Sequence, residues 1–208
     1  TVKNIPVLTH GATDPSLGNK AVYRTLMRLG PTYNKYGRAF HAICKYYGWK
    51  RVAIMAKDFH TCDFGAHSIN SYFPLNNLTV AEWIRIGQRG FTDEEMEEYL
   101  DRLYQRSRSP SRSFQFCTIQ NGFLNFIAVI IVCISVEDLN RLLLRAHQKG
   151  MLENGEMVFL GYTMLPGEHT DKPWSEVTNN ATVPLEVQRL YRYFKMVSFN
   201  LHFAYWAK

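Results

Sequence analysis

The 208-residue sequence lacks the motifs by which common enzymes are recognised. It contains no HExxH pair for zinc, no GxGxxG or GxxxxGK(S/T) loop to hold phosphates, and no GxSxG turn for a nucleophilic serine. Its four cysteines show none of the short CxxC spacings of zinc sites. The sequence therefore predicts that this chain is not an enzyme and binds no metal or cofactor.

Long apolar runs are missing too. Residues 123–134 are apolar apart from Asn125, but a membrane-spanning helix needs about 20 such residues. Because this run is rich in β-branched residues and leads into a helix start, a core strand is favoured over a membrane span. The chain begins at Thr1 without a signal-peptide pattern and stops in the apolar stretch LHFAYWAK. We therefore expect a segment of a longer protein, cut at both ends.

Excess charge is slight. The 24 basic and 18 acidic side chains leave a net charge of +6, and basic residues gather only at residues 102–112. Nucleic-acid-binding proteins concentrate positive charge on one face or in a recognisable motif, and the sequence has no such motif. We interpret the basic cluster as solvated surface and expect no nucleic-acid partner.

The sequence does contain enough apolar residues for a core of normal size, with 46% hydrophobic and 14% aromatic side chains. It also contains two N-glycosylation acceptors, at Asn77 and Asn180. Each pattern is common by chance, but together they favour a secreted or cell-surface location.

Strand and helix patterns alternate along the chain. Strands are expected at residues 5–9, 23–29, 51–57, 78–86, 126–134 and 157–160, and helices at residues 32–47, 64–73, 92–106, 135–149 and 183–197. Thr32, Thr92 and Ser135 are the expected helix caps, Gly48 and Gly150 end two helices, and the first strand is expected to be buried. This alternation predicts an α/β fold with a parallel sheet and flanking helices.

One segment, residues 107–125, does not fit this alternation, because connections of about 2–6 residues are usual. It begins as an Arg/Ser tract and continues without a pattern. A long surface loop and non-native sequence from a misread splice boundary are both open interpretations. We expect this segment to pack poorly.

In parallel α/β sheets, ligands bind beyond the carboxyl ends of the strands. The loops expected at that edge are residues 10–13, 58–63, 135–137 and 161–167. The candidate ligand contacts taken from these loops are His10, Thr13, Asp58, Phe59, His60, Tyr162, Met164 and Leu165. His60, Cys62 and Asp63 also suggest a Cys/His or metal site, but no second ligand pair is spaced to match, so an ordinary polar loop is favoured.

A family resemblance runs through most of the chain. Its parts are an apolar strand, a small-residue loop at residues 9–12, a YxxLxRxxPxYxKxG pattern at residues 23–37, and a helix closed by Trp49 before a buried strand. Further matching stretches are residues 62–64, 129–135, 142–151, 158–165 and 171–174. In these stretches the chain resembles the ectodomains of natriuretic peptide receptors and related receptor guanylyl cyclases. Residues 107–125 and the last residues fall outside the resemblance.

This resemblance implies a type I periplasmic-binding-protein-like fold, present here as a partial two-lobe domain. It assigns residues 1–30 to the end of the first lobe, residues 31–165 to the second lobe with the atypical insertion 107–125, and residues 166–208 to a loop and helix returning towards the first lobe. It also implies that Cys62 pairs with a cysteine outside this chain. Cys44 is expected on the core face of its helix and Cys133 in a buried strand, so both are expected to be free thiols.

The resemblance further implies binding of a peptide hormone on the extracellular side of the cell membrane. The intact protein would be a single-pass receptor, a homodimer, and a source of cGMP signals through a cyclase domain outside this sequence. A small-molecule or amino-acid sensor of the same fold is the alternative, because Thr9 and Thr13 offer hydroxyl groups. An enzyme with a site at His60 and Cys62 is a third interpretation. Because much of the cleft is expected to lie elsewhere, we expect the isolated chain to bind hormone weakly or not at all.

Overall fold

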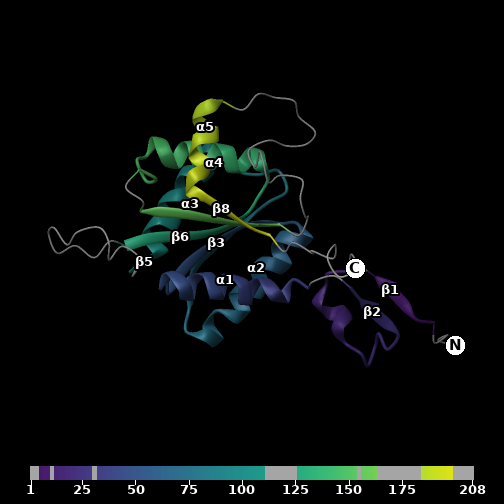
Figure 1. The fold of residues 1–208 in the computed structure, drawn as a ribbon. Helices are drawn as coiled ribbons and strands as arrows, with labels where there is room; N and C mark the ends of the chain where they lie inside the picture. Colours follow the sequence, from purple (N-terminus) through teal and green to yellow (C-terminus); the bar gives the residue numbers. More distant parts are fainter. Residues whose placement is uncertain are drawn as a thin grey trace, which may run out of the picture.

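The computed structural model of the protein describes residues 5–9, 12–29, 32–110, 126–153, 156–163 and 184–198. Figure 1 shows a large α/β lobe and a small unit near the N-terminus. Five parallel strands of the lobe lie in the order β4-β3-β6-β7-β8, which confirms the predicted α/β class with a parallel sheet. Their bounds are β3 (Arg51–Lys57), β4 (Thr79–Ile86), β6 (Phe126–Cys133), β7 (Met157–Thr163) and β8 (Phe194–Ser198), and the short β5 (Arg108–Pro110) pairs antiparallel with β6.

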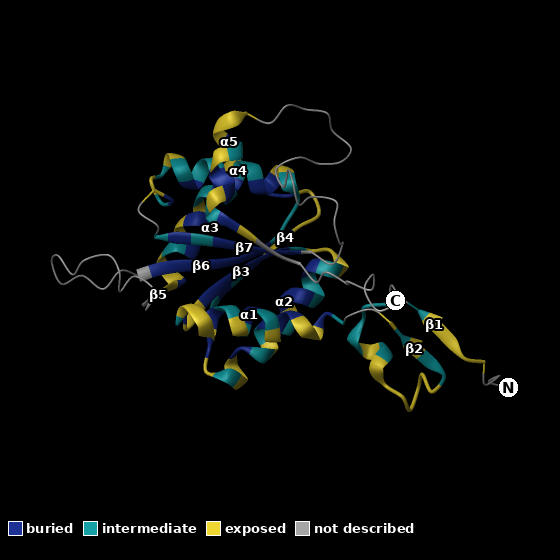
Figure 2. Cartoon of the chain, in the orientation of Figure 1, coloured by how far each residue is buried: buried dark blue, intermediate teal, exposed yellow. Residues whose placement is uncertain are grey.

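Helices cover both faces of this sheet (Figure 1). One face carries α1 (Asn34–Tyr47) and α2 (His60–Tyr72), and the other carries α3 (Asp93–Arg106), α4 (Val136–Gln148) and α5 (Leu185–Leu190). Alternate strand residues point to opposite faces, so Ile54 joins the core cluster of α1 and α2 while Met55 joins that of α3 and α4. Central strands buried on both sides explain the continuous apolar runs in the sequence, and Figure 2 shows them as the buried centre of the lobe.

Some helix ends follow local sequence signals, and one expected cap does not. Thr92 caps α3 in a full capping box, in which the Glu95 N–H donates to Thr92 Oγ1 at 3.2 Å and the Thr92 N–H donates to Glu95 Oε2 at 2.9 Å. Gly48 ends α1 in the left-handed region, at φ 72°. The expected Thr32 cap is wrong, because the N-cap of α1 is Tyr33 and no side chain caps it.

The last expected helix, residues 183–197, is also wrong over most of its length. The helix α5 has only six residues, and a short 3-10 turn, Tyr191–Tyr193, leads into β8. Residues 194–198 (FKMVS) do not alternate strictly, because Met196 and Val197 are adjacent apolar residues, so their sequence pattern alone does not define a strand. Pairing of β8 with the neighbouring β7 completes the sheet there and outweighs the local helical pattern.

The small unit near the N-terminus is a two-stranded parallel sheet. It pairs β1 (Val7–Thr9) with β2 (Leu26–Arg28), and a 3-10 turn, Pro15–Gly18, lies between them in sequence. Both strands were expected, but the burial predicted for the first is wrong, since Val7 is 50% and Leu8 62% exposed. No helix of the described residues covers this sheet in the way that α1 to α5 cover the main one (Figure 2).

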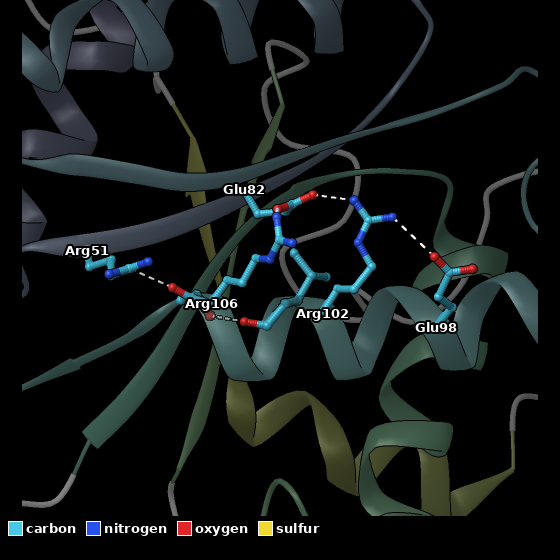
Figure 3. A network of polar contacts seen from close by, with 7 residues as sticks. Arg51, Glu82, Glu98, Arg102 and Arg106 are labelled. Carbon is cyan, nitrogen blue, oxygen red and sulfur yellow. Dashed lines mark hydrogen bonds and ion pairs between the residues drawn. The ribbon is translucent and has the colours of Figure 1, made fainter.

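A buried carboxylate fixes α3 to the edge strand β4 (Figure 3). Glu82 of β4 accepts hydrogen bonds from Arg102 and from Arg106, the latter at 2.5 Å, and Arg102 also pairs with Glu98 at 3.3 Å. Arg51 donates to the carbonyl oxygen of Arg106 at 2.5 Å. Burial works to raise the pKa of the Glu82 carboxyl, but hydrogen bonds and charge from the two guanidinium groups outweigh it and hold that pKa below its ordinary value. Two members of the predicted basic cluster therefore form ion pairs within the fold.

The atypical segment is described only where it begins. Ser107 follows the end of α3, and residues 108–110 form β5. Residues 111–125 lie outside the described residues, so their poor packing stays a prediction. Within the described ranges, no helix combines the length and apolar character needed to cross a membrane.

Candidate functional site

The carboxyl edge of the sheet holds three predicted contact residues in a tight turn after β3. The Asp58 N–H donates to the carbonyl oxygen of Ile86, at the end of β4, at 2.7 Å, and the Phe59 N–H donates to that of Lys57 at 2.7 Å. Asp58 is exposed, and Phe59 keeps 58% of its surface exposed. His60 then begins α2, so the loop expected at residues 58–63 is shorter than predicted. Backbone hydrogen bonds between two strand ends thus hold an exposed aromatic side chain at this edge.

Stacked rings connect this turn to the start of α1. The exposed His60 ring lies 6.1 Å from that of Phe64, with an interplanar angle of 19°. The Phe64 ring in turn stacks on Tyr33 at 5.6 Å. Offset stacking at such centroid distances is favourable for aromatic rings. These stacked rings connect the exposed His60 side chain to the buried core.

The small N-terminal unit approaches the same end of the lobe. The Tyr33 N–H donates to the carbonyl oxygen of Thr13 at 3.3 Å. Hydrogen bonds from Ser16 are the main cause of a lowered pKa at the Asp14 carboxyl, and the charges of Arg28 and His60 add to it. The fold therefore brings Thr13 and His60, 47 positions apart in sequence, to one side of the molecule.

Tyr162, another predicted contact, lies beneath α2 rather than on the open edge. It is 4% exposed, its hydroxyl donates to the carbonyl oxygen of Cys62 at 2.5 Å, and its ring lies 4.8 Å from that of Tyr36. Burial raises the pKa of the Tyr162 hydroxyl. A Cβ atom on Gly65 would come within 2.3 Å of the Tyr162 ring, so glycine is what lets α2 pack this closely. Tyr162 is therefore buried in the lobe and does not lie on the exposed edge where it was expected.

A disulfide joins Cys62, in the first turn of α2, to Cys133 at the end of β6. This corrects two expectations, since the partner of Cys62 lies within the chain and Cys133 is not a free thiol. Cys44 is a buried free thiol as expected, and burial raises its pKa to about 12. The disulfide occupies the Cys62 sulfur, so Cys62 is neither a nucleophile nor a metal ligand. Across the part of the chain that the structure describes, no three His, Cys, Asp or Glu residues are grouped to hold a metal.

Sequence reasoning missed the role of Asp138 near the same edge. Asp138 is 7% exposed, accepts a hydrogen bond from Ser135 Oγ at 2.8 Å, and lies 3.8 Å from Lys57 Nζ and 3.6 Å from Arg141 Nη1. A Cβ atom on Gly90 would sit 2.9 Å from its Oδ1. One carboxylate thus holds together the end of β3, the β4–α3 connection and the start of α4. The only sequence signal was the acidic Asp138 three residues after the cap Ser135, a near capping box that indicates a helix start but not this junction.

The remaining predicted site residues divide into two groups. His10, Met164, Leu165 and the acceptor Asn180 lie outside the described residues. Asn77 is described and exposed, at the amino end of β4 and therefore at the opposite edge of the sheet from Phe59 and His60.

A parallel α/β lobe with exposed side chains at its carboxyl edge and a second small unit beside that edge has the architecture of a ligand-binding domain. The family model described as "Receptor family ligand binding region" matches residues 1–202. The chain belongs to this family, and its fold is that of a periplasmic-binding-protein-like lobe.

Part of the chain is also similar to a distantly related receptor protein. Receptor-type guanylate cyclase gcy-28 of Caenorhabditis elegans is 35% identical to the chain over 72 residues. The match covers 34% of this chain and 6% of that protein. The chain therefore corresponds to a small part of the relative's length.

Proposed function

We propose that the chain binds a peptide hormone on the extracellular side of the membrane, as part of a natriuretic-peptide-receptor-like receptor that signals through cGMP. The observation that carries this proposal is the group of exposed side chains Asp58, Phe59 and His60 at the carboxyl edge of the sheet. The family supports a ligand-binding role, and the name of the cyclase relative supports cGMP as the signal.

The exposed side chains at the carboxyl edge favour a peptide over a single amino acid as the ligand. A free amino acid is usually enclosed on most of its surface by a pocket with convergent polar groups. Phe59 instead presents 58% of its surface at the outside of the lobe, beside the exposed His60. Exposed aromatic side chains held by a rigid turn are typical anchors for a larger partner.

The two-part arrangement gives such a ligand a way to signal. We assign residues 1–30 to the end of a first lobe, residues 31–165 to the second lobe, and residues 166–208 to the return. The separation of β1 and β2 from the main sheet supports this division (Figure 1). A peptide that contacts both Thr13 and His60 would favour one arrangement of the two parts, which is a population shift. In the intact receptor, a homodimer would pass this change across the membrane.

The test is an NMR titration of the 208-residue chain with a natriuretic peptide and, separately, with L-glutamate. NMR detects the weak binding expected of this segment. With the peptide, we expect shifts to concentrate at Thr13 and residues 58–60, and we expect the Phe59→Ala variant to weaken binding by roughly tenfold, as loss of about 1.4 kcal/mol would.

A matched control is Tyr46→Ala, which removes an even more exposed ring (83%, against 58% for Phe59) from the far end of α1 and should leave the titration unchanged. Shifts at the same residues with L-glutamate and none with the peptide would replace the proposal with an amino-acid sensor. Peptide shifts spread over the surface, and unchanged by Phe59→Ala, would place the binding site elsewhere.

A further inference from the structure

The positive charge of the chain is concentrated in residues 15–57. This stretch holds nine Lys or Arg residues and no Asp or Glu, whereas the other 165 residues hold 15 basic and 18 acidic side chains. The nine basic residues are separated by as many as seven positions, so they form no cluster in the sequence. Whether they meet is decided by the fold.

The helix α1 brings three of them onto one face. Lys35, Arg38 and Lys45 are exposed and follow one another at intervals of three and seven residues, which places them on the same side of an α-helix. The buried residues of α1 make up its opposite side, so these three face away from the sheet. We call them the basic row; it is about 15 Å long, at about 1.5 Å per residue.

Basic side chains on the other face of the lobe are compensated within the fold. Arg141 of α4 pairs with Asp93 at 2.5 Å, and Lys149 at the end of α4 pairs with Asp101 at 2.8 Å. Acidic residues of α3 thus offset basic residues of α4. None of the ion pairs among the described residues includes a member of the basic row. The row is therefore positive charge that this part of the fold leaves uncompensated.

The basic row is also unfavourable for α1 itself. Lys35 lies in the first turn, where the helix dipole disfavours a cation, and that turn has no acidic residue, whereas α3 begins with three. Lys35 and Arg38, three positions apart on one face, repel each other. An anionic partner would relieve both effects.

A hollow of about 360 Å³ adjoins the end of the basic row. The described residues that line it include no acidic side chain, and its polar members are His41, Lys45, Lys50, Asn76 and Asn77. Ammonium and amide groups donate hydrogen bonds to the oxygens of an anion. A linear polyanion that lies along α1 can place one anionic group in this hollow, which a flat membrane surface cannot do.

We propose that the basic row and the adjoining hollow bind a sulfated glycosaminoglycan chain. This proposal rests on the proposed extracellular location, where such polysaccharides are abundant linear polyanions and a nucleic acid is not expected. Sulfate groups pair with Lys35, Arg38 and Lys45, and the counterions that they release make the binding dependent on salt. Because Lys50 immediately precedes β3, the hollow lies at the amino edge of the sheet, opposite the edge that holds Phe59.

The experiment measures heparin binding by calorimetry at several salt concentrations. It uses the 208-residue chain secreted from animal cells, so that any glycan on Asn77 is present. The test variant is Arg38→Gln, Lys45→Gln, which should keep the wild-type Tm because Gln is as good a helix former as Arg and Lys. Its affinity for heparin should fall about tenfold, since each exposed ion pair contributes a few-fold, and its salt dependence should be weaker. The exchange Arg38→Lys, Lys45→Arg keeps both charges and should bind like the wild type.

The matched control is Arg189→Gln, Lys195→Gln. It removes two exposed charges from α5 and β8 that take part in no ion pair among the described residues, and it should leave heparin affinity nearly unchanged. Equal weakening by the two double variants would show that only net charge matters and would overturn the site.

The partner is tested with the wild type. Fully desulfated heparin and vesicles of phosphatidylserine should bind much more weakly than heparin. Absence of heparin binding, or equal or tighter binding of either comparison ligand, would overturn a sulfated polysaccharide as the partner. Failure of the natriuretic-peptide titration while heparin still binds would instead count against the proposed peptide binding and leave this inference standing.

Discussion

The lobe and the small N-terminal unit build parallel sheets from similar apolar strands, with opposite results. In the lobe, Ile54 and Ile131 are completely buried between two helix layers. In the small unit, Val7 and Leu8 are at least half exposed. The strand sequences alone do not explain this difference, because both are apolar runs bounded by turns. What differs is the presence of helices with apolar faces to cover the sheet, so stability should be concentrated in the lobe.

The sharpest test of this comparison is a matched pair of core and strand truncations. Phe40 of α1 is fully buried and packs edge-on against Tyr162 at 5.8 Å. Phe40→Ala should lower the free energy of unfolding by about 3–5 kcal/mol, because it removes a large side chain and leaves a cavity. Leu8→Ala should change it by less than about 0.5 kcal/mol. Urea titrations followed by tryptophan fluorescence measure both, and equal losses would mean that the two sheets share one core.

Loss of the disulfide should have the next largest effect on stability, and it should affect the lobe but not the small unit. It links positions 71 residues apart in the lobe, and the small unit contains no cysteine. The double variant Cys62→Ala, Cys133→Ala should lose about 2–5 kcal/mol of stability, as removal of a long cross-link does. Reductant should lower the wild type to the level of that variant and leave the variant itself unchanged. Hydrogen exchange at Val7 and Leu29, which bond within the small unit, should not respond; faster exchange there would show that the parts unfold together.

Acid should then weaken the lobe through Glu82. The ordinary carboxyl pKa is 4.5, and in the fold it is lower because Arg102 and Arg106 bind the charged form. A group with a lowered folded-state pKa stabilises the protein fully above its unfolded value, and this contribution is lost as the pH falls below 4.5. Melting curves of the wild type from pH 7 to pH 3 should therefore drop more steeply than those of Glu82→Gln.

At pH 7, Glu82→Gln should itself be less stable by about 1–3 kcal/mol, the range for loss of hydrogen bonds to charged groups. Parallel pH profiles for the two proteins would contradict the ion pairs drawn in Figure 3.

Removal of a helix cap should give the smallest difference in stability between the lobe and the small unit. Ser135 caps α4, a helix with five buried residues, whereas Asp14 caps a four-residue 3-10 turn of the small unit with none. Ser135→Ala should cost about 1 kcal/mol. Asp14→Ala should leave thermal stability of the chain nearly unchanged, because no core depends on that turn. A larger loss for Asp14→Ala than for Ser135→Ala in calorimetry would reverse the comparison.

The parts of the fold that local signals determine were predictable. Thr92 and Gly48 mark helix ends by their own hydrogen bonds and dihedral angles, and β3 follows its apolar run to the residue. The strand at residues 194–198 was not predictable, because its conformation depends on pairing with β7, which is distant in sequence. The burial of the first strand was mispredicted for the same reason, since burial is decided by neighbours that the strand sequence does not name.

The position of the candidate site in the fold was predictable, but the arrangement of its side chains was not. The rule that ligands lie beyond strand carboxyl ends leads to Asp58, Phe59 and His60 without a structure. It also led to Tyr162, which alternation along β7 turns under α2, where it is 4% exposed. The Cys62–Cys133 pairing and the junction at Asp138 needed the spatial arrangement, because their members lie on separate strands and helices.

The contact between Gly65 and Tyr162 has a consequence for the history of this family. With 2.3 Å between the ring and the place of a Cβ atom, residue 65 cannot gain a side chain alone: a side chain there becomes tolerable only after residue 162 has become smaller. Among related sequences the two positions should therefore change together, and a relative that carries alanine at the first should lack tyrosine at the second. In related sequences, the residue at one of these two positions therefore limits which residues the other can have while α2 still packs on β7.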